Sequence, residues 1–125
     1  MKIRHIVLAG ALSIATIAAI GCTDFERTAF QSLSGSKAVL DTAQQDYEPA
    51  PVGTGKLPHN ACVYALINDG KAAQTAAVDQ LQVYDVALKA GQSTAAAETT
   101  ITAELATIAV DVGKVKALYS NPSCT

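Results

Sequence analysis

The stretch TAAAETTITAELATIAVDVGKVKALY, residues 94–119, decides the fold. Its larger apolar side chains recur at alternating steps of four and three residues, which places them on one face of an α-helix. This stripe consists of Ile101, Leu105, Ile108, Val112, Val115 and Tyr119. Ser93 or Thr94 can cap the start of the helix, and Pro122 prevents its continuation. We therefore predict one amphipathic helix over residues 94–119.

The segment before it carries the same pattern over residues 59–90. The stripe there consists of Val63, Ile67, Gly70, Gln74, Ala77, Leu81, Tyr84 and Leu88. Pro58 suits the entrance of this helix and Gly91 suits its end. The turn-prone residues 68–70 leave two shorter helices as an alternative, but one helix is favoured because the stripe keeps its phase. Gln74 lies on the stripe, where a buried polar side chain can fix the register.

A third helix is predicted over residues 24–47. Thr23 and Glu26 have the capping-box spacing of a helix start. The apolar stripe is imperfect, and the segment 34–36, Ser-Gly-Ser, is a point where the helix could bend or begin late. Residues 49–58 hold the prolines and glycines of an exposed linker that cannot continue a helix.

Three amphipathic helices with one apolar stripe each can bury those stripes only against one another. The predicted fold is therefore all-α, a small antiparallel three-helix bundle. In this topology the second helix begins, and the third ends, at the same pole.

The amino terminus has the three parts of a secretory signal peptide. Lys2 and Arg4 lead into an uncharged, mostly apolar stretch that ends at Ala19-Ile20-Gly21-Cys22. A cysteine directly after a small residue resembles the lipobox of bacterial lipoproteins. The resemblance implies cleavage between Gly21 and Cys22 and acylation of the Cys22 sulfur. The rival is an uncleaved transmembrane helix, but the uncharged run of about 18 residues is at the lower edge of what spans a bilayer.

The resemblance also implies where the protein resides. Residues 1–21 form the signal peptide, and residues 22–125 form a single helical domain held to a membrane by its N-terminal lipid. Thr23 follows the cysteine, where aspartate favours retention in the inner membrane. The implied location is therefore the cell envelope, at the outer membrane facing the periplasm.

Charge excludes one class of partner. Removing residues 1–21 leaves seven basic residues against eleven acidic ones, a net charge near −4. Nucleic acids need a positively charged surface, so none is expected as a partner.

Two cysteines remain in the mature chain, Cys62 and Cys124. Two thiols in an oxidising compartment are expected to pair, and the bundle topology places both at the same pole. The predicted disulfide joins the second and third helices. Zinc is not expected, because His59 is the one histidine of the mature chain and no C-x-x-C pair is present.

No catalytic residue and no cofactor site is predicted. His59 has no nucleophile or orienting carboxylate near it in the sequence, and we expect it to be exposed in the first turn of its helix. The acidic pairs Asp46 with Glu48, and Asp79 with Asp85, are expected on solvated faces. Phosphate-binding loops are also absent.

The tyrosines divide between the two poles. Tyr47, Tyr64 and Tyr119 are expected near the disulfide, and Tyr84 toward the other end. They could form a contact surface, but we interpret them first as caps of the core with their hydroxyls in water.

These features favour a non-enzymatic, lipid-anchored helical domain. We expect it to act as a scaffold or interaction subunit with a protein partner in the envelope. A carrier that holds a small ligand between its helices is an alternative. A prophage-derived lysis lipoprotein is a third possibility, on analogy alone.

Overall fold

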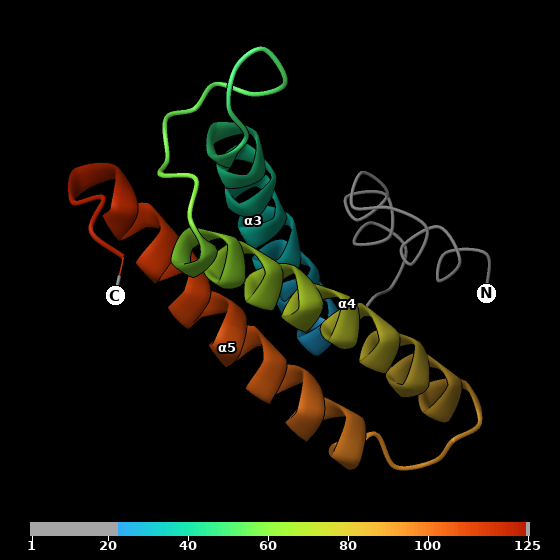
Figure 1. Ribbon diagram of the computed structural model, residues 1–125. Helices are drawn as coiled ribbons and strands as arrows, with labels where there is room; N and C mark the ends of the chain where they lie inside the picture. Colours follow the sequence, from blue (N-terminus) through green and yellow to red (C-terminus); the bar gives the residue numbers. More distant parts are fainter. Residues whose placement is uncertain (1–22, 125) are drawn as a thin grey trace.

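The computed structural model describes residues 23–124 and arranges them as a bundle of three α-helices (Figure 1). The helices are α3 (Asp24–Tyr47), α4 (Ala61–Lys89) and α5 (Ala95–Ser120). Successive helices run in opposite directions. α4 and α5 make the most extensive contact, and α3 packs against both. Residues 23–124 contain no β-strand, so the predicted all-α antiparallel bundle is confirmed. The predicted signal peptide, with Gly21 and Cys22, lies outside the described residues.

The bounds of α3 agree with the predicted helix over residues 24–47. Thr23 caps it, because its Oγ1 accepts a hydrogen bond from the backbone N–H of Glu26 at 3.1 Å. The helix passes through the predicted weak point without a break. Ser36 donates its hydroxyl hydrogen bond to the carbonyl of Ser32 at 2.8 Å, so it satisfies its polar atom within the helix.

α4 is a single helix across residues 68–70, as favoured from the phase of its stripe. Its predicted start at residue 59 was wrong by two positions. Asn60 is the cap, with its Oδ1 accepting from the backbone N–H of Val63 at 3.0 Å, so Pro58 lies before the helix. At the other end Gly91 has a positive φ of 68°, which suits glycine after a helix.

The predicted stripes supply most of the buried hydrophobic residues of α4 and α5. The buried members on α4 are Val63, Ile67, Gly70, Ala77, Leu81 and Tyr84, and those on α5 are Ile101, Ile108 and Val115. Leu88 and Tyr119 were predicted on these stripes but are exposed. α3 begins beside Tyr84, since Thr23 Oγ1 lies 2.8 Å from the Tyr84 hydroxyl. Leu88 is one turn past that point, where the start of α3 no longer covers it.

Gln74 and Gly70 set how α3 meets α4. The Gln74 side-chain amide donates to the carbonyl of Leu33 at 3.3 Å and to the Ser36 hydroxyl at 3.0 Å. These bonds support its predicted role in fixing the register. Gly70 lies at a close contact of the three helices, because a Cβ there would lie 2.9 Å from Leu40 of α3 and 3.6 Å from Asp111 of α5.

Candidate functional site

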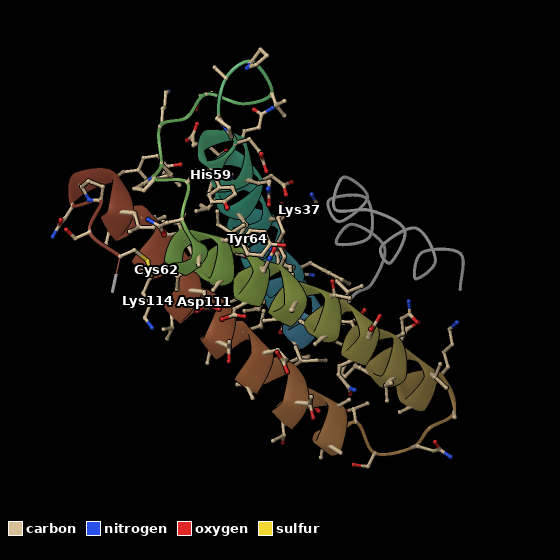
Figure 2. All side chains as sticks on the ribbon, in the orientation of Figure 1. Lys37, His59, Cys62, Tyr64, Asp111 and Lys114 are labelled. Atoms are coloured by element: carbon tan, nitrogen blue, oxygen red, sulfur yellow. A yellow bond between two sulfur atoms is a disulfide. The ribbon has the colours of Figure 1, made fainter. Side chains whose placement is uncertain are left out.

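The end of α3, the linker, the start of α4 and the end of α5 meet at one end of the bundle. Cys62 and Cys124 form a disulfide there, with their Cα atoms 5.8 Å apart. This confirms the predicted pairing and the shared pole of α4 and α5. Figure 2 labels His59, Cys62 and Tyr64 near the beginning of α4. We call this end the aromatic pole and define it by Tyr47, Val52, His59, Tyr64 and Tyr119.

A buried carboxylate holds the aromatic pole together. Asp46, near the end of α3, is buried, although it was predicted on a solvated face. Its Oδ2 accepts a hydrogen bond from the Tyr119 hydroxyl of α5 at 2.5 Å, and its Oδ1 accepts one from the Thr54 hydroxyl of the linker at 2.7 Å. The carboxylate therefore joins two helices and the linker through charge-assisted hydrogen bonds.

The protonation states of this pair are fixed near neutral pH. The hydrogen bond from Tyr119 and then that from Thr54 lower the pKa of Asp46 below its usual value, and the charge of Lys56 adds to this. Burial, together with the hydrogen bond to Asp46 and its negative charge, raises the pKa of Tyr119. Asp46 stays ionised and Tyr119 stays a donor, which suits a structural clamp.

The linker folds back over the end of α3. The backbone N–H of Thr54 donates to the carbonyl of Gln45 at 3.0 Å, and that of Leu57 donates to the carbonyl of Asp46 at 2.8 Å. Gly53 is required for this path, because a Cβ there would lie 2.2 Å from the carbonyl oxygen of Gln45. Leu57 is buried in the core, so the linker is less exposed than the sequence suggested.

Aromatic rings from three segments cover this end of the core. The His59 ring stacks on Tyr47 with centroids 4.3 Å apart, and Tyr64 tilts against Tyr47 at 5.9 Å. His59 lies just before α4 and is exposed, and its Nδ1 is 3.2 Å from the carbonyl oxygen of Tyr47. The expected placement of His59 inside the first helical turn was therefore wrong, but its exposure was correct.

The tyrosines of the pole do not share one role. Tyr47 is buried, as expected for a core cap, whereas Tyr64 is 52% exposed and Tyr119 is 46% exposed. Val52 on the linker is also exposed. The expectation that these tyrosines mainly cap the core holds for Tyr47 alone. Tyr64, Tyr119 and Val52 present aromatic and aliphatic surface to the solvent.

Replacing Tyr119 with phenylalanine should destabilise the bundle at neutral pH by about 1.5–3 kcal/mol, since it removes a hydrogen bond to a buried charge. The folded pKa of Asp46 lies below its unfolded value. Asp46 therefore contributes to the free energy of unfolding at pH values above its pKa in the unfolded chain, and this contribution is lost as the pH falls through its pKa in the folded protein. Urea unfolding should show that the difference between Tyr119→Phe and wild type narrows from pH 7 to about pH 2.

Tyr64→Phe is the matched control. The Tyr64 hydroxyl makes no hydrogen bond to any other residue of the described segment, so its removal should change the free energy of unfolding little at either pH. If Tyr119→Phe lowers the free energy of unfolding by the same amount at both pH values, the role assigned to Asp46 is contradicted.

Sequence reasoning missed the buried acids. Asp85 and Asp111 are buried as well as Asp46, although the acidic pairs that contain Asp46 and Asp85 were expected on solvated faces. Burial, and then the charge of Asp69, raise the pKa of Asp111, while Lys114 opposes the change. The signal for Asp46 was its place at the end of one predicted helix, at the same pole as the end of the helix that carries Tyr119.

Two points about the predicted sites remain: the lipidation site and the metal ligands. Cys22 and Gly21 lie outside the described residues, so lipidation and cleavage stay predictions. Within residues 23–124, no three histidine, cysteine, aspartate or glutamate side chains come together as metal ligands.

Comparisons with known proteins leave the chain without a family assignment. It matches no protein-family model, no curated protein and no solved structure. Among α3, α4 and α5, none has an apolar run long enough to cross a membrane. The function is therefore argued from the residues themselves.

Proposed function

We propose that this chain is a lipid-anchored protein of the cell envelope whose helical bundle binds a protein partner through the aromatic pole. The observation that carries the proposal is the exposure of Tyr64, Tyr119 and Val52 at one end of the bundle. A disulfide and the hydrogen bonds of Asp46 hold this end together. The lipobox-like run ending at Cys22 supports the anchor. Thr23 after that cysteine supports the outer membrane, with the domain in the periplasm.

The path of α3 supports different functions for the two ends of the bundle, with the anchor at the start of the helix and the partner surface at its end. The helix starts at Asp24, two residues after Cys22, and ends at Tyr47 in the aromatic pole. A helix of 24 residues spans about 36 Å at 1.5 Å per residue. An acyl chain on Cys22 would therefore leave the aromatic pole about 36 Å along the helix from the anchored end.

The composition of the pole supports a protein partner. Tyrosine is enriched where partners bind, because it offers a large rigid apolar surface and a polar hydroxyl. The disulfide, the Asp46 hydrogen bonds and the linker fix this surface before binding, which lowers the entropic cost of association. A non-enzymatic role fits a pair, ionised Asp46 and protonated Tyr119, whose protonation states do not change near neutral pH.

The anchor is tested by replacing Cys22 with alanine. The wild-type protein should fractionate with membranes, and mass spectrometry should find an N-terminal acylated cysteine, because two or three acyl chains hold a protein to a bilayer stably. Cys22→Ala should lack acyl chains, and it should either keep its signal peptide or appear in the soluble fraction. An intact Met1 in the wild-type protein would contradict the proposal.

The contact surface is tested by photocrosslinking in intact envelopes. A crosslinking amino acid is placed at Tyr64, or at Val110 on the outer face of α5 as the control. These two positions are matched in exposure, at 52% and 56%. Residue 64 should give a discrete adduct with a protein that residue 110 does not give. Equal adducts from both positions, or none from residue 64, would contradict a specific pole.

A further inference from the structure

We propose that Asp111 is a pH-sensitive switch at the contact between α4 and α5. Its carboxylate takes up one proton from the solvent as the pH falls below neutral, and the neutral carboxyl stabilises the bundle. At neutral pH the ionised carboxylate weakens the same contact. This inference concerns the helices alone, so its test is independent of the anchor at Cys22 and of the partner of the aromatic pole.

Asp111 lies where the three helices come close together. It is 8% exposed, on the side of α5 that packs on Gly70 of α4. A Cβ on Gly70 would lie 3.6 Å from the Asp111 Cβ and 2.9 Å from Leu40 of α3. Figure 2 labels Asp111 and Lys114 on α5. A change in the charge of Asp111 therefore acts at a packed contact rather than in solvent.

One oxygen of this carboxylate has no hydrogen-bond donor. Within residues 23–124, Oδ2 of Asp111 is shielded from solvent and accepts no hydrogen bond from any group. Asp46 is the contrasting case, because its two oxygens accept hydrogen bonds from Tyr119 and Thr54. A buried charge without donors destabilises a fold, and a neutral carboxyl at the same place costs much less.

The charges that face Asp111 come from α4 and α5. Asp69 of α4, next to Gly70, repels the ionised carboxylate, whereas Lys114, three residues further along α5, attracts it. Burial and the charge of Asp69 outweigh Lys114, so the pKa of Asp111 is raised. The protonated form is therefore favoured by the surroundings of the side chain.

The third helix supplies no neutralising charge at this contact. The side chain that α3 brings to Gly70 is that of Leu40, which is apolar and fully buried. The charged residues of α3 on either side of it in the sequence, Lys37 and Asp41, form an ion pair with each other. Lys71 of α4 also lies 3.7 Å from Asp41. These charges are engaged on the surface.

The direction of the pH effect follows from the raised pKa of Asp111. Its contribution to stability is complete below the pKa in the unfolded chain and is lost as the pH rises through the pKa in the folded protein. The pKa of Asp46 is lowered instead, so Asp46 loses its contribution at still lower pH. Between neutral pH and about pH 4, the ordinary value for aspartate, protonation of Asp111 should therefore stabilise the fold.

Asp111→Asn tests the switch, because the amide has the shape of the carboxyl but no charge. Relative to wild type, the variant should gain stability as the pH rises from about 4 to 7. Urea unfolding of the processed protein in mild detergent should show this gain as roughly a tenfold change in the unfolding equilibrium constant for each unit by which folding raises the pKa of Asp111.

Glu104→Gln is the matched control. Glu104 lies seven residues before Asp111 on α5 and is partly exposed. Solvent screens a charge at such a position, so the difference between this variant and wild type should be small at both pH values. If the difference between Asp111→Asn and wild type is also the same at pH 4 and pH 7, the proposal is overturned.

Carbon-13 NMR of the Asp111 carboxyl measures the titration directly. Its midpoint should lie above that of aspartate in the urea-unfolded protein. Asp69→Asn should lower the midpoint and Lys114→Gln should raise it, because the first removes a repelling charge and the second an attracting one. A midpoint at or below the unfolded value, or one that neither variant moves, would also overturn the proposal.

Discussion

Replacing Cys62 and Cys124 together with serine will lower the free energy of unfolding by about 4 kcal/mol. The bridge joins residues 62 positions apart. In the chain-entropy description it stabilises the fold by restricting the unfolded chain, and the effect grows with the size of the closed loop. A small domain has a total stability of about 5–15 kcal/mol, so the loss is a large part of it.

The structure explains why this domain depends on the bridge. Much of its core consists of small side chains, including Ala29, Ala43, Ala73, Ala77 and Ala97. Such residues allow the helices to approach closely but bury little apolar area each. The bridge therefore supplements a core that is modest for the length of the helices.

Urea unfolding and thermal unfolding of the protein in mild detergent measure the effect. The double variant should lose about 4 kcal/mol, its midpoint temperature should fall by about 15–30 °C, and its m-value should rise because the unfolded chain exposes more surface. Wild type under reducing conditions should reproduce all three changes. If the double variant and wild type unfold at the same urea concentration, the core alone carries the stability.

The elements that were predictable from the sequence depend on local patterns. The cap at Thr23, the stop at Gly91 and the phase of the α4 stripe each involve residues within a few positions of one another. The pairing of Cys62 with Cys124 followed from topology, since two adjacent antiparallel helices bring these ends together. Local chemistry and one topological rule were therefore sufficient for the fold.

The elements that were not predictable depend on where the other helices end. Leu88 continues the stripe of α4 without interruption, yet it is exposed because α3 begins beside Tyr84. Asp46 has the spacing of a surface acid, and Tyr119, 73 residues later, gives it a buried partner. A helical period indicates which face of a helix is apolar, but it does not indicate how much of that face a neighbouring helix covers.

Replacing Gly70 with valine should destabilise the bundle by about 1–3 kcal/mol, because overpacking a filled core forces side chains out of their preferred positions. Gly70 lies where all three helices meet. A Cβ at this position would be 2.9 Å and 3.1 Å from the two methyl groups of Leu40, which is fully buried. Valine would add two further carbons to the same space.

The other helix glycines provide matched controls. A Cβ at Gly35 or at Gly113 would have no neighbour within 4 Å. Alanine there should stabilise the bundle by about 0.5–1 kcal/mol, because glycine is the poorer helix former. A loss of stability at all three positions would indicate a general requirement for glycine and contradict the packing explanation for Gly70.

A double-mutant cycle with Leu40 identifies the contact responsible. Leu40→Ala alone should cost about 2–5 kcal/mol, since it leaves a cavity among the three helices. In that background Gly70→Val should cost much less or become favourable, because the valine fills the space that Leu40 has left. The coupling energy should be about 1–3 kcal/mol in the stabilising direction. Strictly additive effects would show that Gly70 serves the close approach of the helices through some contact other than Leu40.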